Sequence, residues 1–145
     1  MGLEAIIFFY NSKEKVKSIL EFKDNIEYKE GNRYIYKKEN CYWIDIEFID
    51  LYSLSIRITL SNPMDYVLQA LFNLLSLLFS LGEGVLIDQN TKQVFTTYNE
   101  EMKEAIKKSY LERRKIFQDI YGNYTSAIGS DDFYRKQNER KKNDD

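Results

Sequence analysis

The stretch that decides the fold runs from Asn62 to Gly82 and reads NPMDYVLQALFNLLSLLFSLG. Asn62 is a preferred N-cap residue, Pro63 suits the first helical position, and Gly82 suits the left-handed residue that ends a helix. Twelve residues of the stretch are apolar, and its polar residues recur every three or four positions. At ~100° per residue the polar residues fall in one stripe about 80° wide. We therefore predict one long helix that is buried on most sides.

The length and composition bound the class of protein. The chain has 145 residues, enough for one domain with a real core. Charged residues make up 30% and apolar residues 43%, which is typical of a globular protein and excludes a disordered chain. The sequence has no histidine, and Cys41 is its only cysteine, which excludes internal disulfides, Cys-rich zinc sites and Cys–His nucleophiles. We predict no metal and no cofactor.

The location of the protein follows from two further features. Met1 to Glu4 lack the basic region of a signal peptide, so we expect a cytoplasmic protein. The long helix is the only candidate for a membrane span, but Asp65, Gln69 and Asn73 would then have to enter lipid. We therefore predict that the chain does not cross a membrane.

Several stretches have the patterns of strands. Leu3–Tyr10 is a continuous apolar run, as expected of a central strand that is covered on both faces. Ile26–Lys38 is typical of a hairpin around a Gly-Asn turn. Tyr42–Ile49 and Tyr52–Leu60 alternate between apolar and polar residues, which predicts antiparallel strands with one packed face and one wet face. A second hairpin is predicted over residues 85–95.

Two further helices are predicted around these strands. Asn11 or Ser12 is expected to cap a short helix that includes Val16. Thr97-x-x-Glu100 is a capping box that opens a helix of which Met102, Ile106, Tyr110, Phe117 and Ile120 mark the inner face. Gly122 ends that helix.

The order of these elements is strand, helix, strands, helix, strands, helix. It predicts an α+β fold with a mainly antiparallel sheet and helices on one face. The first six elements match the βαββαβ ferredoxin-like plan, with a C-terminal helix added. Residues 1–122 form the single α+β domain, and residues 123–145 form a polar C-terminal tail, which we expect to be mobile or tied down only by a partner.

Few residues point to catalysis or to nucleic-acid binding. Without histidine, acid–base chemistry would depend on carboxylate, Lys or Tyr groups. Asp45 and Glu47 lie two apart on one strand face, but solvation of an open sheet face explains them better than an acid pair does. The pI of about 5.4 has the wrong sign for a phosphate binder. We predict a protein that is not an enzyme and does not bind nucleic acid.

The charge pattern points to a protein partner. Residues 39–88 hold seven acids and one base, Arg57. If these acids lie on one side of the fold, their negative electrostatic field steers a basic partner towards it. The alternative is that the acids disperse over different sides of the fold. Period-two alternation turns Trp43, Asp45 and Glu47 away from the helices, with both carboxylates solvated. An exposed Trp suits an interface anchor, unless the tail or a loop covers it. The predicted partner-binding residues are Trp43, Asp45, Glu47, Asp50 and Arg57.

One passage resembles a known family. The helix–Gly–strand passage Leu81–Asp88 (LGEGVLID), the turn after it and Lys92–Phe95 (KQVF) resemble the small cytoplasmic immunity proteins of bacterial polymorphic-toxin and contact-dependent inhibition systems. The element order is similar from Leu3 to Tyr121. The resemblance implies a non-enzymatic inhibitor that binds one cognate toxin domain, here one with a basic surface. It implies no fixed set of binding residues.

Two other classes stay open. One is a structural or assembly subunit, a homodimer or larger homo-oligomer formed through apolar surface of the long helix. The other is an enzyme that uses only carboxylate, Tyr, Lys and Arg groups.

Overall fold

The alternating stretches form one antiparallel sheet, and the apolar stretch forms a helix against it. The computed structural model describes residues 4–16 and 24–144. Its strands are β1 (Ala5–Ser12), β2 (Ile26–Glu30), β3 (Arg33–Lys38), β4 (Tyr42–Phe48), β5 (Ser53–Thr59), β6 (Gly84–Asp88) and β7 (Val94–Phe95). Its helices are α1 (Met64–Ser80), α2 (Glu100–Tyr121) and α3 (Ser130–Asp144).

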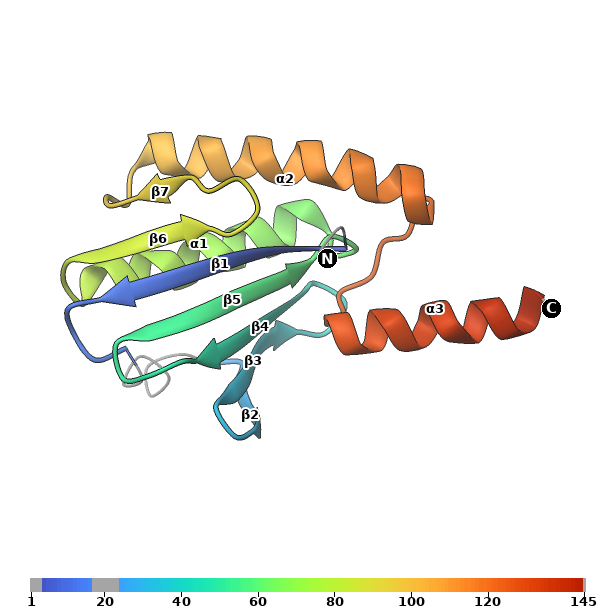
Figure 1. Ribbon diagram of the computed structural model, residues 1–145, viewed down its shortest axis with the longest axis horizontal. Helices are drawn as coiled ribbons and strands as arrows, with labels where there is room; N and C mark the ends of the chain where they lie inside the picture. The colour runs from blue at the N-terminus through green and yellow to red at the C-terminus, as the bar shows by residue number, and fades with distance from the viewer. Residues whose placement is uncertain (1–3, 17–23, 145) are drawn as a thin grey trace.

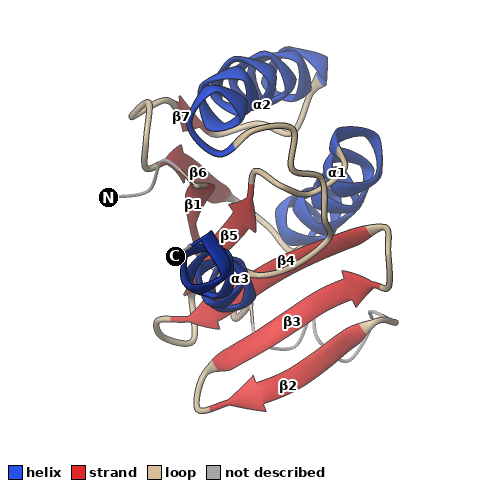
Figure 2. Ribbon diagram, turned by 90° about the vertical axis from the view of Figure 1, so that its right-hand side faces the viewer, coloured by secondary structure: helices blue, strands red, loops and turns tan. Residues whose placement is uncertain are grey.

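The sheet has the strand order β2-β3-β4-β5-β1-β6-β7, and every neighbouring pair is antiparallel. Helices α1 and α2 lie on one face of the sheet, which we call the inner face, and α3 begins on the opposite, outer face (Figures 1 and 2). The predicted α+β class with an antiparallel sheet is confirmed. The expectation that the helices lie on one face is wrong for α3.

Strand β1 occupies the centre of the sheet. It pairs with β5 on one side and with β6 on the other, so β5 and β6 run parallel to each other and α1 connects them across β1. The specific ferredoxin-like plan is not confirmed by this seven-stranded order. The short helix expected near Val16 lies mostly outside the described residues, and Asn11 and Ser12, its expected caps, belong to β1.

The core forms between the inner face and α1. Side chains of β4 and β5 that point inward, such as Ile44, Ile46 and Ile56, are buried. In α1, Leu71 and Leu75 are fully buried among other members of the core. The predicted polar stripe of α1 faces solvent at Asp65, Gln69, Asn73, Ser76 and Ser80. Across residues 4–16 and 24–144, none of the helices combines the length and the apolar character that a membrane span requires.

The helix ends differ in part from the expected caps. Pro63, not Asn62, precedes α1, and the buried Asn62 side chain instead accepts a hydrogen bond from Trp43 N (2.8 Å). The cap of α2 is Asn99, whose side chain accepts a hydrogen bond from Met102 N at 2.9 Å, rather than the predicted Thr97. Gly122 ends α2 as expected, with φ 83°.

The segment after Gly122 is packed against the rest of the chain, which corrects the expectation of a loose tail. Phe133 is fully buried, with its ring centroid 5.6 Å from that of Phe117 and 5.1 Å from that of Tyr121. Ser126 exchanges hydrogen bonds with Ser61 (2.7 and 2.8 Å). Residues 124–133 thus connect the end of α2 to the outer face of the sheet through contacts within the chain itself.

Candidate functional site

The outer face of the sheet changes in character from one side to the other. Directly paired residues of antiparallel strands share a face. The register therefore aligns one row of outward side chains across six strands, from β3 to β7 through β4, β5, β1 and β6. In that order the row consists of Arg33, Glu47, Ser55, Phe9, Ile87 and Val94. It is charged on β3 and β4, small on β5 and apolar on β1, β6 and β7.

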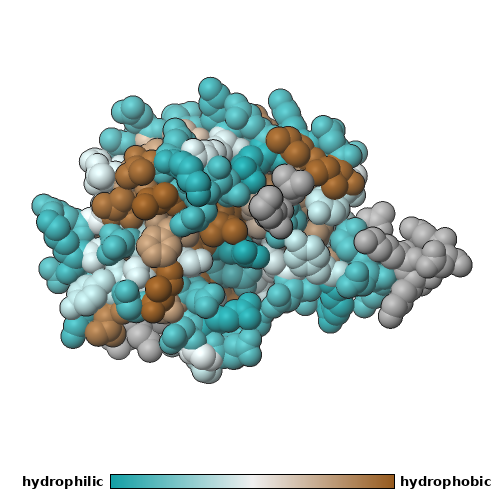
Figure 3. All heavy atoms as spheres, in the orientation of Figure 1, coloured by the Kyte–Doolittle hydropathy of each residue, from teal (hydrophilic) through white to brown (hydrophobic). Residues whose placement is uncertain are grey.

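None of the three described helices covers the apolar side of this face (Figures 1 and 2). We call its outward residues the apolar patch: Ile7, Phe9, Val85, Ile87 and Val94. Val94 is 58% exposed and the other four are half-buried. In Figure 3 apolar side chains gather over β1 and β6, next to hydrophilic ones over β3 and β4. The expectation that the first strand is covered on both faces is therefore wrong for Ile7 and Phe9.

The opposite end of the outer face is covered by the start of α3. A Cβ atom on Gly129 would lie 2.6 Å from Trp43 Nε1 and 2.9 Å from Asp45 Oδ2, so the backbone at Gly129 sits directly on these two side chains. The hydroxyl groups of Ser130 and Thr59 are 3.2 Å apart and both are buried. Trp43 faces outward as predicted, but it is half-buried because the C-terminal segment covers it.

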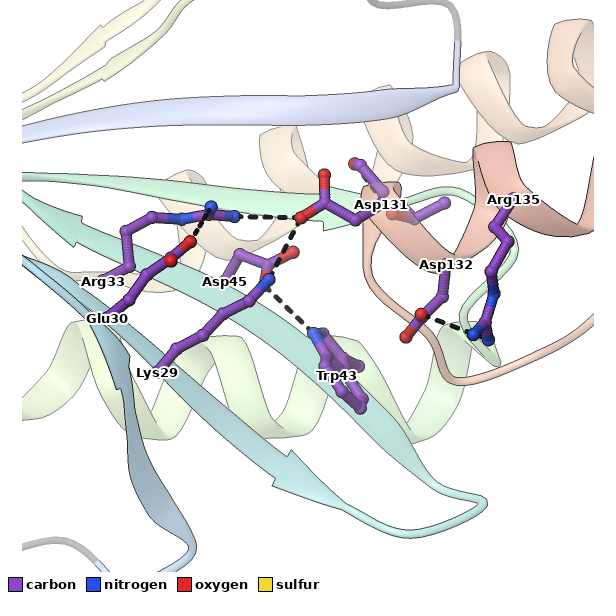
Figure 4. A network of polar contacts seen from close by, with 10 residues as sticks. Lys29, Glu30, Arg33, Trp43, Asp45, Asp131, Asp132 and Arg135 are labelled. Carbon is purple, nitrogen blue, oxygen red and sulfur yellow. Dashed lines mark hydrogen bonds and ion pairs between the residues drawn. The ribbon is translucent and has the colours of Figure 1, made fainter.

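A polar network holds α3 in this position (Figure 4). Asp131 Oδ2 accepts hydrogen bonds from Lys29 Nζ (3.0 Å) and from Arg33 Nη2 (3.3 Å). The hydrogen bond from Lys29 is the main reason why the pKa of Asp131 lies below its ordinary value. Trp43 Nε1 donates to Asp45 Oδ1 at 3.0 Å. The two bonds to Asp131 join β2 and β3 to the first turn of α3, whereas the Trp43–Asp45 bond lies within β4.

The burial of Asp45 contradicts the expectation that both carboxylates of β4 are solvated. Burial raises the pKa of Asp45, although the hydrogen bond from Trp43 and the charges of Lys29 and Arg33 oppose the rise. A hollow of about 480 Å³ opens beside it, and both bases (Lys29, Arg33 and Arg57) and acids (Asp45, Glu47, Asp131 and Asp132) line it. Because the charges of this wall largely neutralise one another, the hollow favours neither an anion nor a cation.

The structure brings four of the five predicted binding residues together. Trp43, Asp45, Glu47 and Arg57 share the outer face, and Asp45 pairs directly with Arg57 across β4 and β5. Asp50 lies apart in the β4–β5 turn, where its side chain accepts a hydrogen bond from Tyr52 N at 2.8 Å.

The acids of residues 39–88 lie on different sides of the fold. Asp88 is buried and accepts hydrogen bonds from the amides of Asn90 (2.9 Å) and Thr91 (3.2 Å). Glu83 forms an ion pair with Lys13, and Asp50 lies in a turn at one end of β4. The alternative in which the acids disperse therefore describes them better than a single-sign field does.

One acid on the outer face has a special position. Among the described residues, Glu47 is exposed and forms no ion pair, whereas Arg33 pairs with Glu30 and Asp131. Ser55 separates Glu47 from Phe9 in the row. Glu47 therefore lies at the border of the apolar patch without an ion pair, because Arg33, which lies directly across from it in the register, bonds Glu30 and Asp131 instead.

Sequence reasoning missed the apolar patch. The sequence predicts Ile7 and Phe9 in a strand covered on both faces and Val85, Ile87 and Val94 in a hairpin. A run of apolar residues looks the same whether its own chain or a partner covers it. The part of the chain that the structure describes contains no group of three or more Cys, Asp or Glu side chains arranged to hold a metal ion. No family model matches the chain, and no curated protein and no solved structure shows significant similarity to it.

Proposed function

We propose that this chain is a non-enzymatic inhibitor that binds another protein, an immunity protein that neutralises a cognate bacterial toxin domain in the cytoplasm. It binds through the apolar patch and the charged residues beside it. The observation that carries the proposal is the apolar row of the half-buried Phe9 and Ile87 and the exposed Val94, at the centre and edge of the outer face. Contiguous exposed apolar side chains with a polar border are typical of protein interfaces.

The border of the patch supports a basic partner. Glu47 is an exposed acid there without an ion pair among the described residues, and a cation placed opposite such a rim carboxylate speeds association. Arg57 also borders the patch, since it pairs directly with Ile7. Aromatic and Arg side chains are enriched among residues that dominate binding energy, so Phe9 and Arg57 are suited to a binding role. Trp43, the anchor expected from the sequence, supports the site from beneath the start of α3.

The test is neutralisation of a toxin. The toxin domain encoded beside the gene for this chain is expressed in a bacterial host, with and without the chain, and growth is measured. The native chain should restore growth. Val94→Asp and Glu47→Lys should weaken or abolish the rescue, because one places a charge in the patch and the other reverses the charge at its border.

Ile116→Asp is the matched control. Ile116 is 50% exposed on α2, so the substitution also places an acid on exposed apolar surface, but outside the outer face. Its rescue should equal that of the native chain. Failure of the native chain to bind or neutralise the toxin domain would reject the proposed function. Equal losses for Ile116→Asp and Val94→Asp would move the binding site away from the patch.

An assembly subunit is the second candidate, and one observation favours it. Helix α2 exposes the large apolar side chains Leu111, Ile116 and Ile120. Ile120 was expected on the inner face of this helix and lies outside it. Size-exclusion chromatography with light scattering separates the two candidates: a stable homodimer that Ile116→Asp disrupts supports assembly, and a monomer supports the inhibitor.

A further inference from the structure

We propose, on the premise of the protein-binding function above, that the apolar patch receives a single amphipathic helix of the partner, with a lysine or arginine of that helix opposite Glu47. This names the kind of element that binds and its charge.

The dimensions of the uncovered surface fit one helix. Strands β5, β1, β6 and β7 follow one another in the sheet, so they span three strand spacings, about 14 Å at about 4.8 Å each. A helix with its side chains is about 10–12 Å across. The side chains beneath it would be Ser55, Phe9, Ile87 and Val94, of which the small Ser55 allows close approach at the charged border.

The layers of the fold support a helix rather than another kind of element. A sheet whose two faces both carry apolar residues is stable when helices cover both faces. Helix α1 covers the inner face, whereas α3 covers only one end of the outer face (Figures 1 and 2). A partner helix over β1 and β6 would complete the second layer. An added strand would instead bind a sheet edge, β2 or β7, and would leave the patch exposed.

Charge fixes the chemistry of the helix border. Arg57 lies 3.9 Å from the buried Glu4, and Arg33 pairs with two acids, so these two arginines already have acidic partners. Glu47 forms no ion pair among the described residues. A base at the edge of the incoming apolar stripe would compensate Glu47, whereas an acid there would be repelled.

The test uses three synthetic peptides of about 18 residues, long enough to populate a helix. The first has an apolar stripe at helical spacing bordered by lysines. The second has glutamates in place of these lysines. The third has the composition of the first in scrambled order. Each is titrated into the ¹⁵N-labelled native chain and into Glu47→Lys, and the amide shifts are mapped.

The lysine-bordered peptide should shift the amides of Phe9, Ile87 and Val94 and should bind the native chain about two- to fivefold more tightly than the glutamate-bordered peptide, the worth of an exposed ion pair. Glu47→Lys should reverse that preference. Val94→Asp should remove the shifts, and Ile116→Asp should leave them.

Three results would overturn the inference. If the scrambled peptide binds equally well, the bound element is not a helix. If the amide shifts are confined to β2 or to α2, the binding site is not the apolar patch. If the amide shifts of the patch depend on protein concentration without any peptide, a second copy of this chain occupies the patch instead of a partner helix. None of these results depends on toxin neutralisation. If the chain neutralises the toxin domain but fails the peptide test, the inference of a partner helix is rejected and the proposed function still stands.

Discussion

The indole N–H of Trp43 donates a hydrogen bond to the carboxylate of Asp45, two residues further along β4, at a distance of 3.0 Å. The backbone at Gly129 closes directly over both side chains. Trp43 is the only tryptophan of the chain, so its fluorescence reports on the fit of the C-terminal segment.

Gly129→Ala should loosen the C-terminal segment. The added methyl group would lie 2.6 Å from Trp43 Nε1, closer than real carbon atoms approach, so the segment or the indole ring has to move. We expect a loss of about 1–3 kcal/mol in the free energy of unfolding, as for an overpacked core site, and Trp43 emission at longer wavelength. Chemical unfolding followed by fluorescence measures both. Asn123→Ala, at an exposed position of the same segment, is the control and should change neither.

Phe133→Ala should destabilise the whole domain. The Phe133 ring is fully buried among Phe117, Tyr121 and Tyr124 and holds the end of α2 to the segment that crosses to the outer face. We expect a loss of about 3–5 kcal/mol in the free energy of unfolding, measured by denaturant titration. Tyr134→Ala, its half-exposed neighbour, should cost clearly less. Equal losses would mean that Phe133 is not an anchor.

Leu75→Ala and Asn73→Ala test the rotation of α1. Leu75 is fully buried, so its truncation should cost about 2–5 kcal/mol of unfolding free energy. Asn73 lies in the exposed polar stripe, and its truncation should leave the thermal midpoint nearly unchanged. Calorimetry of the two variants decides the matter, because similar midpoints would mean that the stripe is buried.

Asp45→Asn should be more stable than the native chain at neutral pH. Burial raises the pKa of Asp45 above its ordinary value of 3.8, so the folded state holds this proton more tightly than the unfolded state does. The contribution of Asp45 to stability therefore falls as pH rises from the ordinary pKa through the raised one. Asparagine stays neutral and can still accept the hydrogen bond of Trp43. We expect a higher thermal midpoint at pH 7 and a difference that shrinks as the pH falls towards 4.

Asp50→Asn is the control with the opposite sign. The backbone hydrogen bond from Tyr52 lowers the pKa of Asp50, so its carboxylate contributes stability above its ordinary pKa, and this contribution is lost as the pH falls through the lowered value. The Asn variant should therefore melt slightly lower than the native chain at pH 7. Shifts in the same direction for both variants would show that the burial of Asp45 does not govern its titration.

Local sequence patterns predicted the helices and strands more accurately than they predicted what packs around them. The spacing of Leu71 and Leu75 and the alternation in β4 and β5 are set by helix and strand geometry, so the sequence sufficed for them. Asn62 failed as a predicted cap because its side chain bonds Trp43 N and Ile128 O, which belong to distant segments. The cover over Trp43 likewise comes from Gly129, and the alternation of residues in β4 gives no information about this distant contact.

The apolar patch is a surface that local sequence patterns cannot predict. Period two places Phe9 and Ile87 on the outer face once the register is known, but the register joins strands that are far apart in the sequence. A half-covered apolar side chain and a fully covered one have the same sequence pattern. Predicting the uncovered surface therefore required knowing that α3 reaches only one end of the sheet.

The central position of β1 has a consequence for the synthesis of the chain. This strand leaves the ribosome before its partners in the sheet, yet Ala5 pairs with Thr59 and Phe8 pairs with Asp88, and Ile7 N donates a hydrogen bond to Asn90 across a separation of 83 residues. At about 5–20 residues per second, β1 waits several seconds for its second neighbour. Until then the apolar stretch Ala5–Tyr10 has no complete sheet to enter, and pairings this distant slow folding even after release. A chaperone that binds nascent apolar segments should therefore engage this chain at its N-terminal strand.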